Sequence, residues 1–535
     1  MRRSSKYSLT VTGVVLGLLL LSGTVLAANP NGNWPFAGAD LQNTHYQDKQ
    51  AKISVKTAPN LAKQWQFATG GDVSATPALD DKNAYFPDSA GNLFAVNRAT
   101  GAQLWAHKIS DYTGVANDYA RTTPAIVGNA LIFGDQAGKV GSPASIMAVD
   151  TNTGNLLWRT QADSFPYSIV TQSAVANGQD VYVGVSSFEE FFSAVIPGYL
   201  CCTFRGSVLD LNAATGQIKW RTYTVPTGYS GGAVWGSTNA IDTGRGSLYV
   251  STGNNYSLPG SVITCISGNP TNPQACLDPA DHFDSILALN LNTGVVKWAF
   301  AALPLDAWNV NCGLAIPIPP GIIHPDPTQC PNPPGPDFDF GQGPALFKTH
   351  APGSGTPVDL VGDGQKSGKY WALNPDNGQV AWSTQVGPGG VSGGLQWGSS
   401  TDGSTIWAAS ANSEGKPWQL IQNGQPTGPI ITGGHWSALD AATGKILWQT
   451  ADPKGAGDPG AVSGGNGVVY ACSNSGDMYA LNGASGTILW SYQSIPTGGG
   501  CAAGAAISNG SVYWGTGYHP LGGAGPSTLT AFSAK

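Results

Sequence analysis

Residues 93–105 read LFAVNRATGAQLW, and the same phrase returns six more times along the chain. Each copy has an alternating apolar run, then Asn or Asp, then a glycine preceded in most copies by Thr, and last a Trp four residues after that glycine. The seven copies end at Trp105, Trp158, Trp220, Trp298, Trp382, Trp448 and Trp490. A phrase that recurs in register this often marks one structural unit repeated through the chain.

Each part of the phrase has a physical meaning. The alternating run is typical of a strand with one buried face, and the Asn/Asp-to-Gly stretch is typical of a turn in which glycine takes a positive φ. The Trp then begins the return strand and packs against a neighbour. Successive copies lie 42 to 84 residues apart, which is room for about four strands and a variable loop. The repeat therefore predicts the blades of a β-propeller.

The two ends of the chain supply one more blade. Leu529–Phe532 matches the first half of the phrase, and Leu61–Trp65 matches only its second half. Joining the halves closes the ring and removes exposed sheet edges. We therefore expect an all-β fold, an eight-bladed β-propeller whose N- and C-terminal strands share one blade, and a single domain over residues 28–535.

The first residues predict export. Arg2, Arg3 and Lys6 precede an apolar stretch, Val11–Leu26, and small residues follow at Val25–Ala27. We expect residues 1–27 to be a cleaved signal peptide and the protein to be periplasmic or secreted, without a stable membrane anchor; an N-terminal anchor is the alternative. A net charge of −7 without a basic cluster argues against nucleic acid as a partner.

Eight cysteines in an exported chain predict disulfides. Proximity in sequence favours Cys201–Cys202, Cys265–Cys276, Cys312–Cys330 and Cys472–Cys501, although the sequence leaves other connectivities open and the adjacent pair could form two separate disulfides or stay as thiols. The chain has no C-x-x-C-H haem motif and no C-x-x-C pair typical of structural zinc. Long insertions, Phe191–Cys202, Leu258–His282 and Trp308–Pro344, are candidates for a binding surface.

Motifs outside the repeat resemble a known family. The blade phrase and the opening Trp34–Asp40 are similar to those of the pyrroloquinoline quinone (PQQ) alcohol dehydrogenases. Cys201–Gly206 and Asp306–Asn309 look most like the polyvinyl alcohol dehydrogenase branch. The resemblance implies that PQQ lies on the propeller axis over a calcium ion.

By the same resemblance, the calcium site contains Glu189, Asn254, Asp306 and Asn309, the last two in one loop. Carboxylate and amide oxygens suit this hard cation. Taken singly, Glu189 is equally well a surface acid, Asn254 a turn former and Asp306 a loop cap.

The resemblance also implies the cofactor contacts. Trp235 matches the aromatic residue under the quinone ring, and it falls outside the repeat phrase, which weakens a purely structural role. The other implied contacts are Thr171, Ser186, Lys366, Arg121, Cys201 and Cys202. Lys366 would contact the quinone oxygens. Arg121 would pair with a carboxylate of the cofactor, and the alternative is that Arg121 is an ordinary surface arginine.

One departure from the family concerns the catalytic base. The methanol dehydrogenase branch carries an acid directly after the loop Trp, whereas this chain has Asn309, and an amide cannot act as a base. Asp306 is therefore the expected base, or the base lies elsewhere.

The expected activity is oxidation of an alcohol, of the secondary or polymeric kind such as polyvinyl alcohol, with electrons passed to a separate cytochrome c. The alternatives are a protein-binding scaffold of similar repeat, and a quinoprotein that has lost catalysis.

Overall fold

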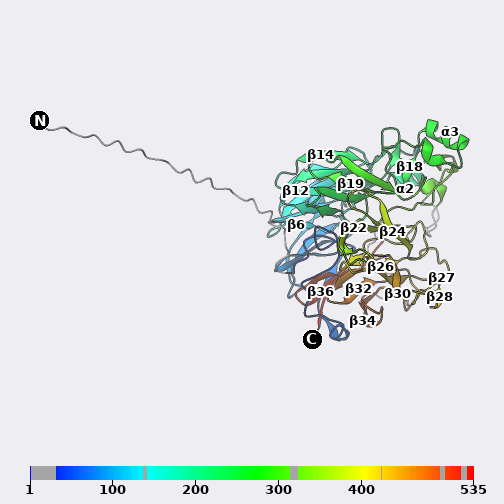
Figure 1. The fold of residues 1–535 in the computed structure, drawn as a ribbon. Helices are drawn as coiled ribbons and strands as arrows, with labels where there is room; N and C mark the ends of the chain where they lie inside the picture. The colour runs from blue at the N-terminus through cyan, green and yellow to red at the C-terminus, as the bar shows by residue number, and fades with distance from the viewer. Residues whose placement is uncertain are drawn as a thin grey trace.

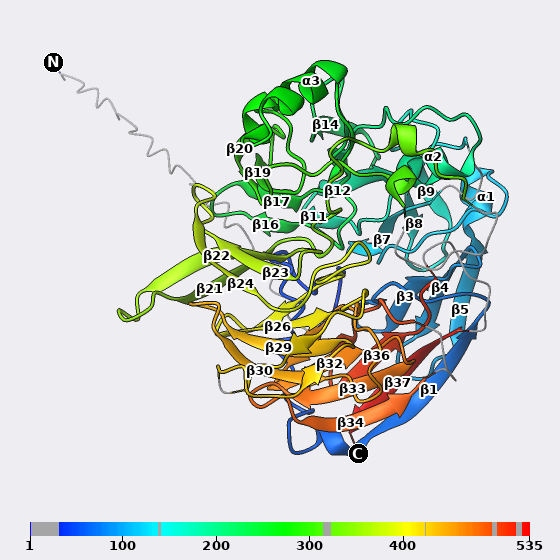
Figure 2. The same ribbon diagram turned by 90° about the vertical axis from the view of Figure 1, so that its right-hand side faces the viewer.

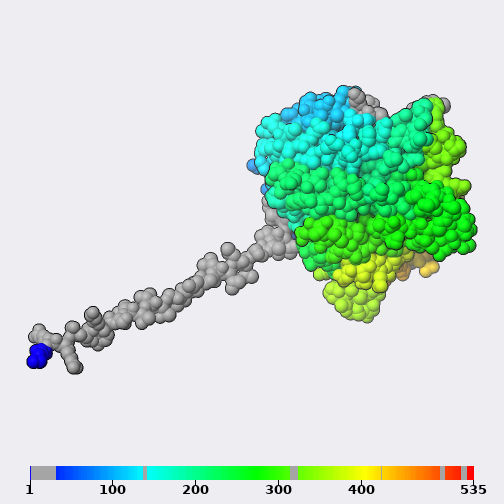
Figure 3. Space-filling model, turned by 90° about the horizontal axis from the view of Figure 1, so that it is seen from above, coloured from blue at the N-terminus to red at the C-terminus, as the bar shows by residue number. Residues whose placement is uncertain are grey.

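Eight antiparallel sheets surround a common axis and confirm the expected propeller (Figure 2). This computed structural model describes Met1 and residues 32–136, 141–313, 323–422, 424–494, 500–519 and 527–534. The expected signal peptide, residues 1–27, lies outside the described residues except for Met1. Successive blades appear as bands from cyan through green to yellow across the surface (Figure 3).

The strands follow chain order within the sheets, with the exception of the shared one. The first half of the ring contains β1 (Leu61–Thr69), β2 (Ala78–Leu79), β3 (Asn83–Pro87), β4 (Asn92–Asn97), β5 (Gln103–Lys108), β6 (Ala125–Val127), β7 (Ala130–Gly134), β8 (Ser145–Asp150), β9 (Leu156–Gln161), β10 (Ser168–Ile169), β11 (Val175–Asn177), β12 (Asp180–Ser187), β13 (Ser207–Asn212), β14 (Ile218–Tyr223), β16 (Ala240–Asp242), β17 (Ser247–Ser251), β19 (Ser285–Asn290) and β20 (Val296–Ala301). The second half contains β21 (Ala345–His350), β22 (Pro357–Gly364), β23 (Lys369–Leu373), β24 (Val380–Gln385), β25 (Ser400–Thr401), β26 (Thr405–Ser410), β29 (His435–Asp440), β30 (Ile446–Ala451), β31 (Ser463–Gly465), β32 (Val468–Cys472), β33 (Asp477–Asn482), β34 (Ile488–Gln493), β35 (Ala506–Ser508), β36 (Ser511–Gly515) and β37 (Ser527–Ala534).

Short elements occupy the loops. Two ribbons are formed by β15 (Ser230–Gly231) with β18 (Asn255–Ser257) and by β27 (Trp418–Gln419) with β28 (Ile430–Ile431). The helices are α1 (Ile109–Thr113), α2 (Glu189–Val195), α3 (Gly260–Gly268) and the 3-10 turns η1 (Ala58–Asn60), η2 (Pro273–Cys276), η3 (Val310–Cys312) and η4 (Pro327–Gln329). Helix α3 caps a lobe at one end of the molecule (Figure 1). No helix in the described ranges is long and apolar enough to cross a bilayer.

The ring closes through both termini, as the half-phrases predict. Strand β1 pairs antiparallel with β37 and sets Trp65 opposite Ala531. In Figure 2 the blue β1 runs beside the red β37. The N-terminal strand thus forms the outer edge of a blade whose other strands come from the C-terminus.

The repeat Trp residues link each blade to the next. The indole N–H of Trp105 donates to the Thr151 carbonyl at 3.0 Å, and that of Trp158 donates to the Ala213 carbonyl at 2.8 Å. The bond continues through the shared blade, where Trp490 donates to the Leu61 carbonyl at 2.9 Å. This packing explains why the repeated phrase contains a glycine. Gly216 has φ +71°, and a Cβ on it would lie 2.4 Å from the Trp158 ring. Only glycine fits both the turn and the indole face.

The four proposed disulfides are all present. Cys201–Cys202, Cys265–Cys276, Cys312–Cys330 and Cys472–Cys501 are bonded, which confirms the pairing suggested by proximity. The second ties α3 to η2, and the third holds the ends of the long insertion after Trp308 together.

Candidate active site

A cavity of about 240 Å³ opens on one end of the propeller axis. Its lining comes from loops of several blades around the ring, including Arg121 after β5, Trp235 before β16 and Trp397 before β25. The residues expected from the sequence that do line it are Arg121, Thr171, Ser186, Trp235, Asn254 and Lys366. The fold thus gathers six residues that are spread over 246 positions of the chain.

Trp235 presents a fixed indole to this cavity. Its N–H donates to Oδ2 of Asp339 at 3.0 Å, and its ring packs edge-to-face on Trp397, with the centroids 5.5 Å apart. The buried indole N–H of Trp397 has no hydrogen-bond partner among the described residues. The cavity therefore offers a large aromatic surface beside an unused donor.

Lys366 and two aspartates form a buried charge cluster on the cavity wall. The Lys366 ammonium lies 3.0 Å from Oδ1 of Asp337 and 2.9 Å from Oδ2 of Asp339. Burial opposes the charge on Lys366, but the two carboxylates outweigh it and raise the lysine pKa. Burial also raises the pKa of Asp337 well above its usual range, against the attraction of Lys366. The ammonium lies 5.3 Å from the Trp235 ring centroid, so charge and aromatic surface share one site.

The two aspartates differ in what their oxygens already bind. Asp339 accepts from the Asn254 backbone N–H at 2.7 Å as well as from Trp235 and Lys366. Both oxygens of Asp337 accept only from Lys366 within the described part of the chain. Asp337 therefore keeps lone pairs available on the cavity side.

The two adjacent acids at the start of α2, Glu189 and Glu190, have different surroundings. The Glu189 carboxylate accepts the backbone N–H groups of Thr203 and Phe204, at 2.8 and 2.7 Å, and the Tyr199 hydroxyl at 2.8 Å. Glu189 is not among the residues that line the cavity, whereas Glu190 is. Oε2 of Glu190 is buried and has no hydrogen-bond partner in the described residues. Burial, followed by the charge of Asp339, raises the pKa of Glu190 to about 8.

Asn254 is oriented by its amide nitrogen. Nδ2 donates to the carbonyls of Asn255, at 3.0 Å, and Trp308, at 2.8 Å. Since both N–H bonds are used, Oδ1 is the end of the side chain that can serve a ligand in the cavity.

Asp306 and Asn309 lie behind the cavity wall. Asp306 is fully buried, and its carboxylate accepts the backbone N–H groups of Asp337 and Phe338 at 3.2 and 2.8 Å. Burial raises the pKa of Asp306 to about 6, against hydrogen bonds that lower it. Asn309 caps η3, and its Nδ2 donates to the Tyr256 and Gln329 carbonyls at 3.0 Å each. Neither side chain lines the cavity.

The Cys201–Cys202 disulfide also stays out of the lining. The segment that follows it supplies the N–H groups that hold Glu189, so the pair borders the site through that carboxylate. Sequence reasoning did not single out Glu190, Asp337, Asp339 or Trp397. The available signals were the doublet Glu189-Glu190 and the alternation Asp337-Phe338-Asp339 just before β21.

The chain is similar to several known proteins. A family model named PQQ_2, described as outer membrane protein assembly factor BamB, matches residues 57–222 and 432–535. The chain belongs to the PQQ_2 family. The chain is similar to the polyvinylalcohol dehydrogenase of Sphingopyxis sp. (strain 113P3), with 29% identity over 92% of this chain and 73% of that protein. The polyvinylalcohol dehydrogenase of Pseudomonas sp is 26% identical over 93% of this chain and 74% of its own.

The fold of this PQQ_2 member is shared with a solved structure. The quinohemoprotein alcohol dehydrogenase of Comamonas testosteroni superposes with a TM-score of 0.67 at 18% identity, over 94% of this chain and 80% of that one. The expected resemblance to the quinoprotein alcohol dehydrogenases, polyvinyl alcohol dehydrogenase among them, is confirmed.

Proposed function

We propose that this protein is a PQQ- and Ca²⁺-dependent dehydrogenase that oxidises secondary alcohol groups of a polymer such as polyvinyl alcohol to carbonyls. The observation that carries the proposal is the combination, in one cavity, of the Trp235 surface, the Lys366–Asp337 pair and a Glu190 oxygen that has no hydrogen-bond partner in the described part of the chain. The two polyvinylalcohol dehydrogenases, similar over most of the chain, support the substrate class.

The cavity fits a flat, acidic cofactor. Trp235 would provide an aromatic floor. The Arg121 guanidinium, the Thr171 and Ser186 hydroxyls and the Trp397 N–H, which has no hydrogen-bond partner within the described ranges, would provide polar contacts. When bound, PQQ would supply the hydride acceptor for the alcohol carbon. Lys366 would hold a positive charge next to the oxygens on which negative charge develops.

The donor set fits a hard cation. Glu190 brings a desolvated carboxylate oxygen and Asn254 an amide oxygen, which are the ligand types that Ca²⁺ prefers. No group of three His, Cys, Asp or Glu side chains in the described ranges is arranged to hold a metal unaided. Glu190 and Asn254 are the residues that would hold the cation, and the cation would favour the ionised form of the nearby acids.

Asp337 is the proton acceptor that the geometry favours. It lines the cavity and accepts hydrogen bonds only from Lys366 among the described residues. Asp339 accepts three hydrogen bonds, and Asp306, the base expected from the sequence, holds backbone N–H groups outside the cavity lining. Oδ of Asp337 would take the hydroxyl proton. The Lys366 ammonium would stabilise the negative charge that develops on the oxygens of the bound cofactor.

The cavity mouth suits an apolar-backboned substrate. Phe188, Phe191, Val310 and Val391 line it, so the methylene groups of a polymer would contact side chains of matching polarity. We infer that electrons leave to a separate cytochrome c and that the protein works in the periplasm or outside the cell.

Reconstitution tests the proposal directly. Purified protein with PQQ and Ca²⁺ should reduce a dye with polyvinyl alcohol and 2,4-pentanediol, and chelation should abolish the reaction until Ca²⁺ is restored. Asp337→Asn should lower turnover about 10²–10⁴-fold with PQQ still bound. Full activity of Asp337→Asn together with an inactive Asp306→Asn would return the base to Asp306. Protein that binds PQQ and Ca²⁺ but oxidises no alcohol would be a quinoprotein without catalysis, and protein that binds neither would support the scaffold described by the family model.

A further inference from the structure

Three segments meet behind the charge cluster of the cavity wall. The Asp306–Trp308 segment lies against Asn255, with bonds from the Asn255 N–H to the Asp306 carbonyl, 3.1 Å, and from the Trp308 N–H to the Asn255 carbonyl, 2.8 Å. On its other side the Gly335 N–H donates to the Ala307 carbonyl at 2.8 Å. Backbone hydrogen bonds on both sides of the segment therefore hold Asp306 in place, independently of its side chain.

The Asp306 carboxylate accepts hydrogen bonds from the turn that contains Asp337 and Asp339. Oδ1 accepts from the N–H of Asp337 and Oδ2 from the N–H of Phe338. Asp306 is 0% exposed, so water does not compete for these bonds. A carboxylate that accepts two backbone N–H groups in a dry interior makes charge-assisted bonds, which are stronger than neutral ones.

The turn needs this hold. Asp337 has φ +58°, in the left-handed region that an aspartate adopts only at a cost. Asp337 and Asp339 must both face Lys366, and the peptide units held by Asp306 lie at and between them. A small rotation of those units would move both carboxylates on the ammonium.

Gly335 shows how closely the turn fits the carboxylate. A Cβ at this position would lie 1.9 Å from Oδ1 of Asp306 and 2.6 Å from the Ala307 nitrogen. Any side chain there would push the carboxylate off the turn, so this glycine is required by the contact itself.

We propose that Asp306 is a positioning residue: its carboxylate fixes the 335–338 turn and so holds Asp337 and Asp339 in place on Lys366. The importance of this for catalysis rests on the proposed function, whereas the ordering of the turn does not. Asp306 itself touches neither the cavity nor the space for a substrate.

Hydrogen exchange on the cofactor-free protein tests the ordering. In Asp306→Asn the amides of Asp337 and Phe338 should exchange about tenfold faster or more, the factor for one lost charge-assisted hydrogen bond. Gly335→Ala should give the same local change from the other side of the contact while leaving every acid in place. The controls are Asp458→Asn, an equally buried acid in another blade, and Gly260→Ala, whose added Cβ meets nothing within 4 Å.

Activity then separates the two proposals. With PQQ and Ca²⁺, both Asp306→Asn and Gly335→Ala should lower kcat far more than they raise the KM for alcohol, and both controls should match the wild type. Unchanged exchange at Asp337 and Phe338 in both variants overturns the positioning role. Faster exchange in a protein whose wild type oxidises no alcohol would keep the positioning role and reject the proposed dehydrogenase.

Discussion

Individual side chains in this site are distinguished by what they already bind. Glu189 and Asp306 accept backbone N–H groups and lie outside the cavity lining, whereas Glu190 and Asp337 line the cavity. Among the described residues, Oε2 of Glu190 has no hydrogen-bond partner and Asp337 accepts only from Lys366. A carboxylate at the cavity with lone pairs left can bind a cation or a proton, and one that holds backbone N–H groups away from the cavity fixes the chain. Acids that look alike in the sequence therefore divide into two groups with different consequences on mutation.

The role of Trp235 can be separated from that of the repeat Trp residues. Trp235→Ala should weaken PQQ binding roughly tenfold, since an aromatic contact contributes about 1 kcal/mol beyond area burial and the floor itself is lost. Trp158→Ala is the control, because its indole N–H links blades rather than facing the cavity. It should lower the melting temperature and leave PQQ affinity of the folded protein unchanged in a fluorescence titration. Normal PQQ binding by Trp235→Ala would make that residue structural.

The glutamate doublet allows a matched pair of substitutions. Glu190→Gln should raise the Kd for Ca²⁺ about 10–100-fold, because it removes a charged ligand without changing shape. Glu189→Gln should change the Kd much less and instead lower stability, since its amide would place N–H against the N–H groups of Thr203 or Phe204. Calorimetric titration with Ca²⁺ in the presence of PQQ measures both. The reverse order of effects would restore Glu189 as the ligand that the sequence suggests.

Sequence reasoning reached the residues that sit beside recognisable motifs. Trp235, Asn254 and Lys366 were found because each lies in a short segment similar to the quinoprotein family, and all three line the cavity. Asp337 was missed because insertion 309–336 separates it from Trp308, so spacing along the chain hides that the fold brings the two segments together. The choice between Glu189 and Glu190 depends on which carboxylate the 203–204 backbone captures, and no sequence pattern encodes that.

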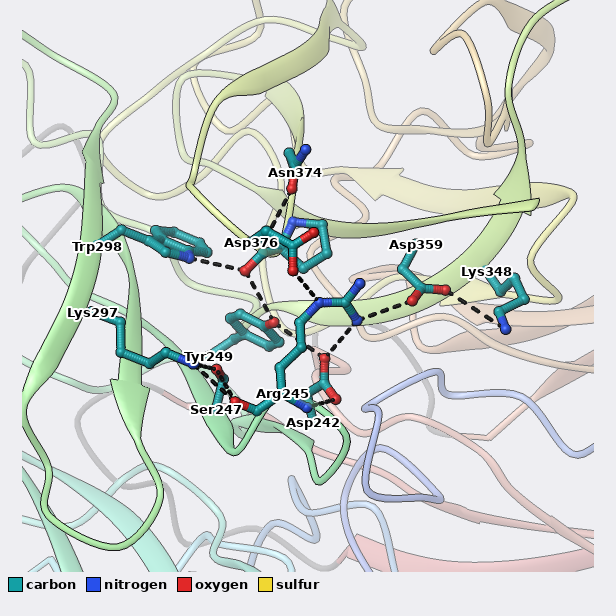
Figure 4. Close-up of polar contacts among 11 residues, drawn as sticks. Asp242, Arg245, Ser247, Tyr249, Lys297, Trp298, Lys348, Asp359, Asn374 and Asp376 are labelled. Atoms are coloured by element: carbon teal, nitrogen blue, oxygen red, sulfur yellow. Dashed lines mark hydrogen bonds and ion pairs between the residues drawn. The ribbon is translucent and has the colours of Figure 1, made fainter. Parts of the chain in front are cut away.

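At the scale of elements, an ionic contact joins two neighbouring blades. Arg245, in the turn between β16 and β17, reaches Asp242 in its own blade at 2.9 Å, and Asp359 at 2.9 Å and Asp376 at 2.7 Å in the next (Figure 4). The Arg245 side chain is 28% exposed, so solvent and salt screen the contact only partly. The three carboxylates raise the pKa of Arg245 despite burial, so it stays charged.

Removing Arg245 should weaken this joint. Arg245→Met should lower the free energy of unfolding by about 1–2 kcal/mol, because it leaves three acids facing one another, one of them buried. Lys348→Met is the control, since that ammonium is 72% exposed and 3.9 Å from Asp359. Urea unfolding compares them. Equal stability of both variants would show that the cluster is an exposed pairing of no consequence.

The shared blade makes a second prediction at this scale. Phe532 in β37 is 1% exposed and packs on Trp490 with the ring centroids 5.0 Å apart. Phe532→Ala should cost about 3–5 kcal/mol, and deleting Leu529–Lys535 should destabilise the whole ring because β1 loses its partner. Ser533→Ala in the same strand should have little effect. Cooperative melting within a degree or two of wild type after the deletion would contradict closure through the termini.

At the scale of the whole molecule, the fold followed from the repeat while the function depended on the loops. Seven copies of one phrase and two half-copies predicted eight blades and their closure, because strand, turn glycine and Trp are all local in sequence. The loops over the axis have no period, so their meeting at one cavity needs the three-dimensional structure. The ring holds the blades in place, and loops from several blades bring the residues of the candidate site together.

Stability of the whole ring should respond to acid through buried histidine. His435 is 0% exposed; its Nε2 donates to the Val386 carbonyl at 2.9 Å, and its buried Nδ1 has no partner in the described residues. Burial lowers the pKa of His435 from 6.5 to about 4, against the bond to Val386. Between these values the unfolded chain binds the proton and the folded chain does not, so this residue's contribution is complete above pH 6.5 and is lost as the pH falls toward 4.

Buried acids change the stability in the opposite direction as the pH falls; Asp281, with a pKa raised to about 7, is one of them. A substitution of His435 separates the contribution of this histidine from theirs. His435→Phe keeps the ring stacked on Trp418, and Gln449 still donates to the Val386 carbonyl at 2.7 Å. Between pH 7.5 and pH 5 the stability of this variant relative to wild type should rise by about 2 kcal/mol, since the protonation penalty is gone. Urea unfolding of the cofactor-free proteins at the two pH values measures the gap. The same substitution at the exposed His350 should leave the stability difference from wild type the same at both pH values. If the difference for His435→Phe is also constant, protonation of His435 does not destabilise the folded protein.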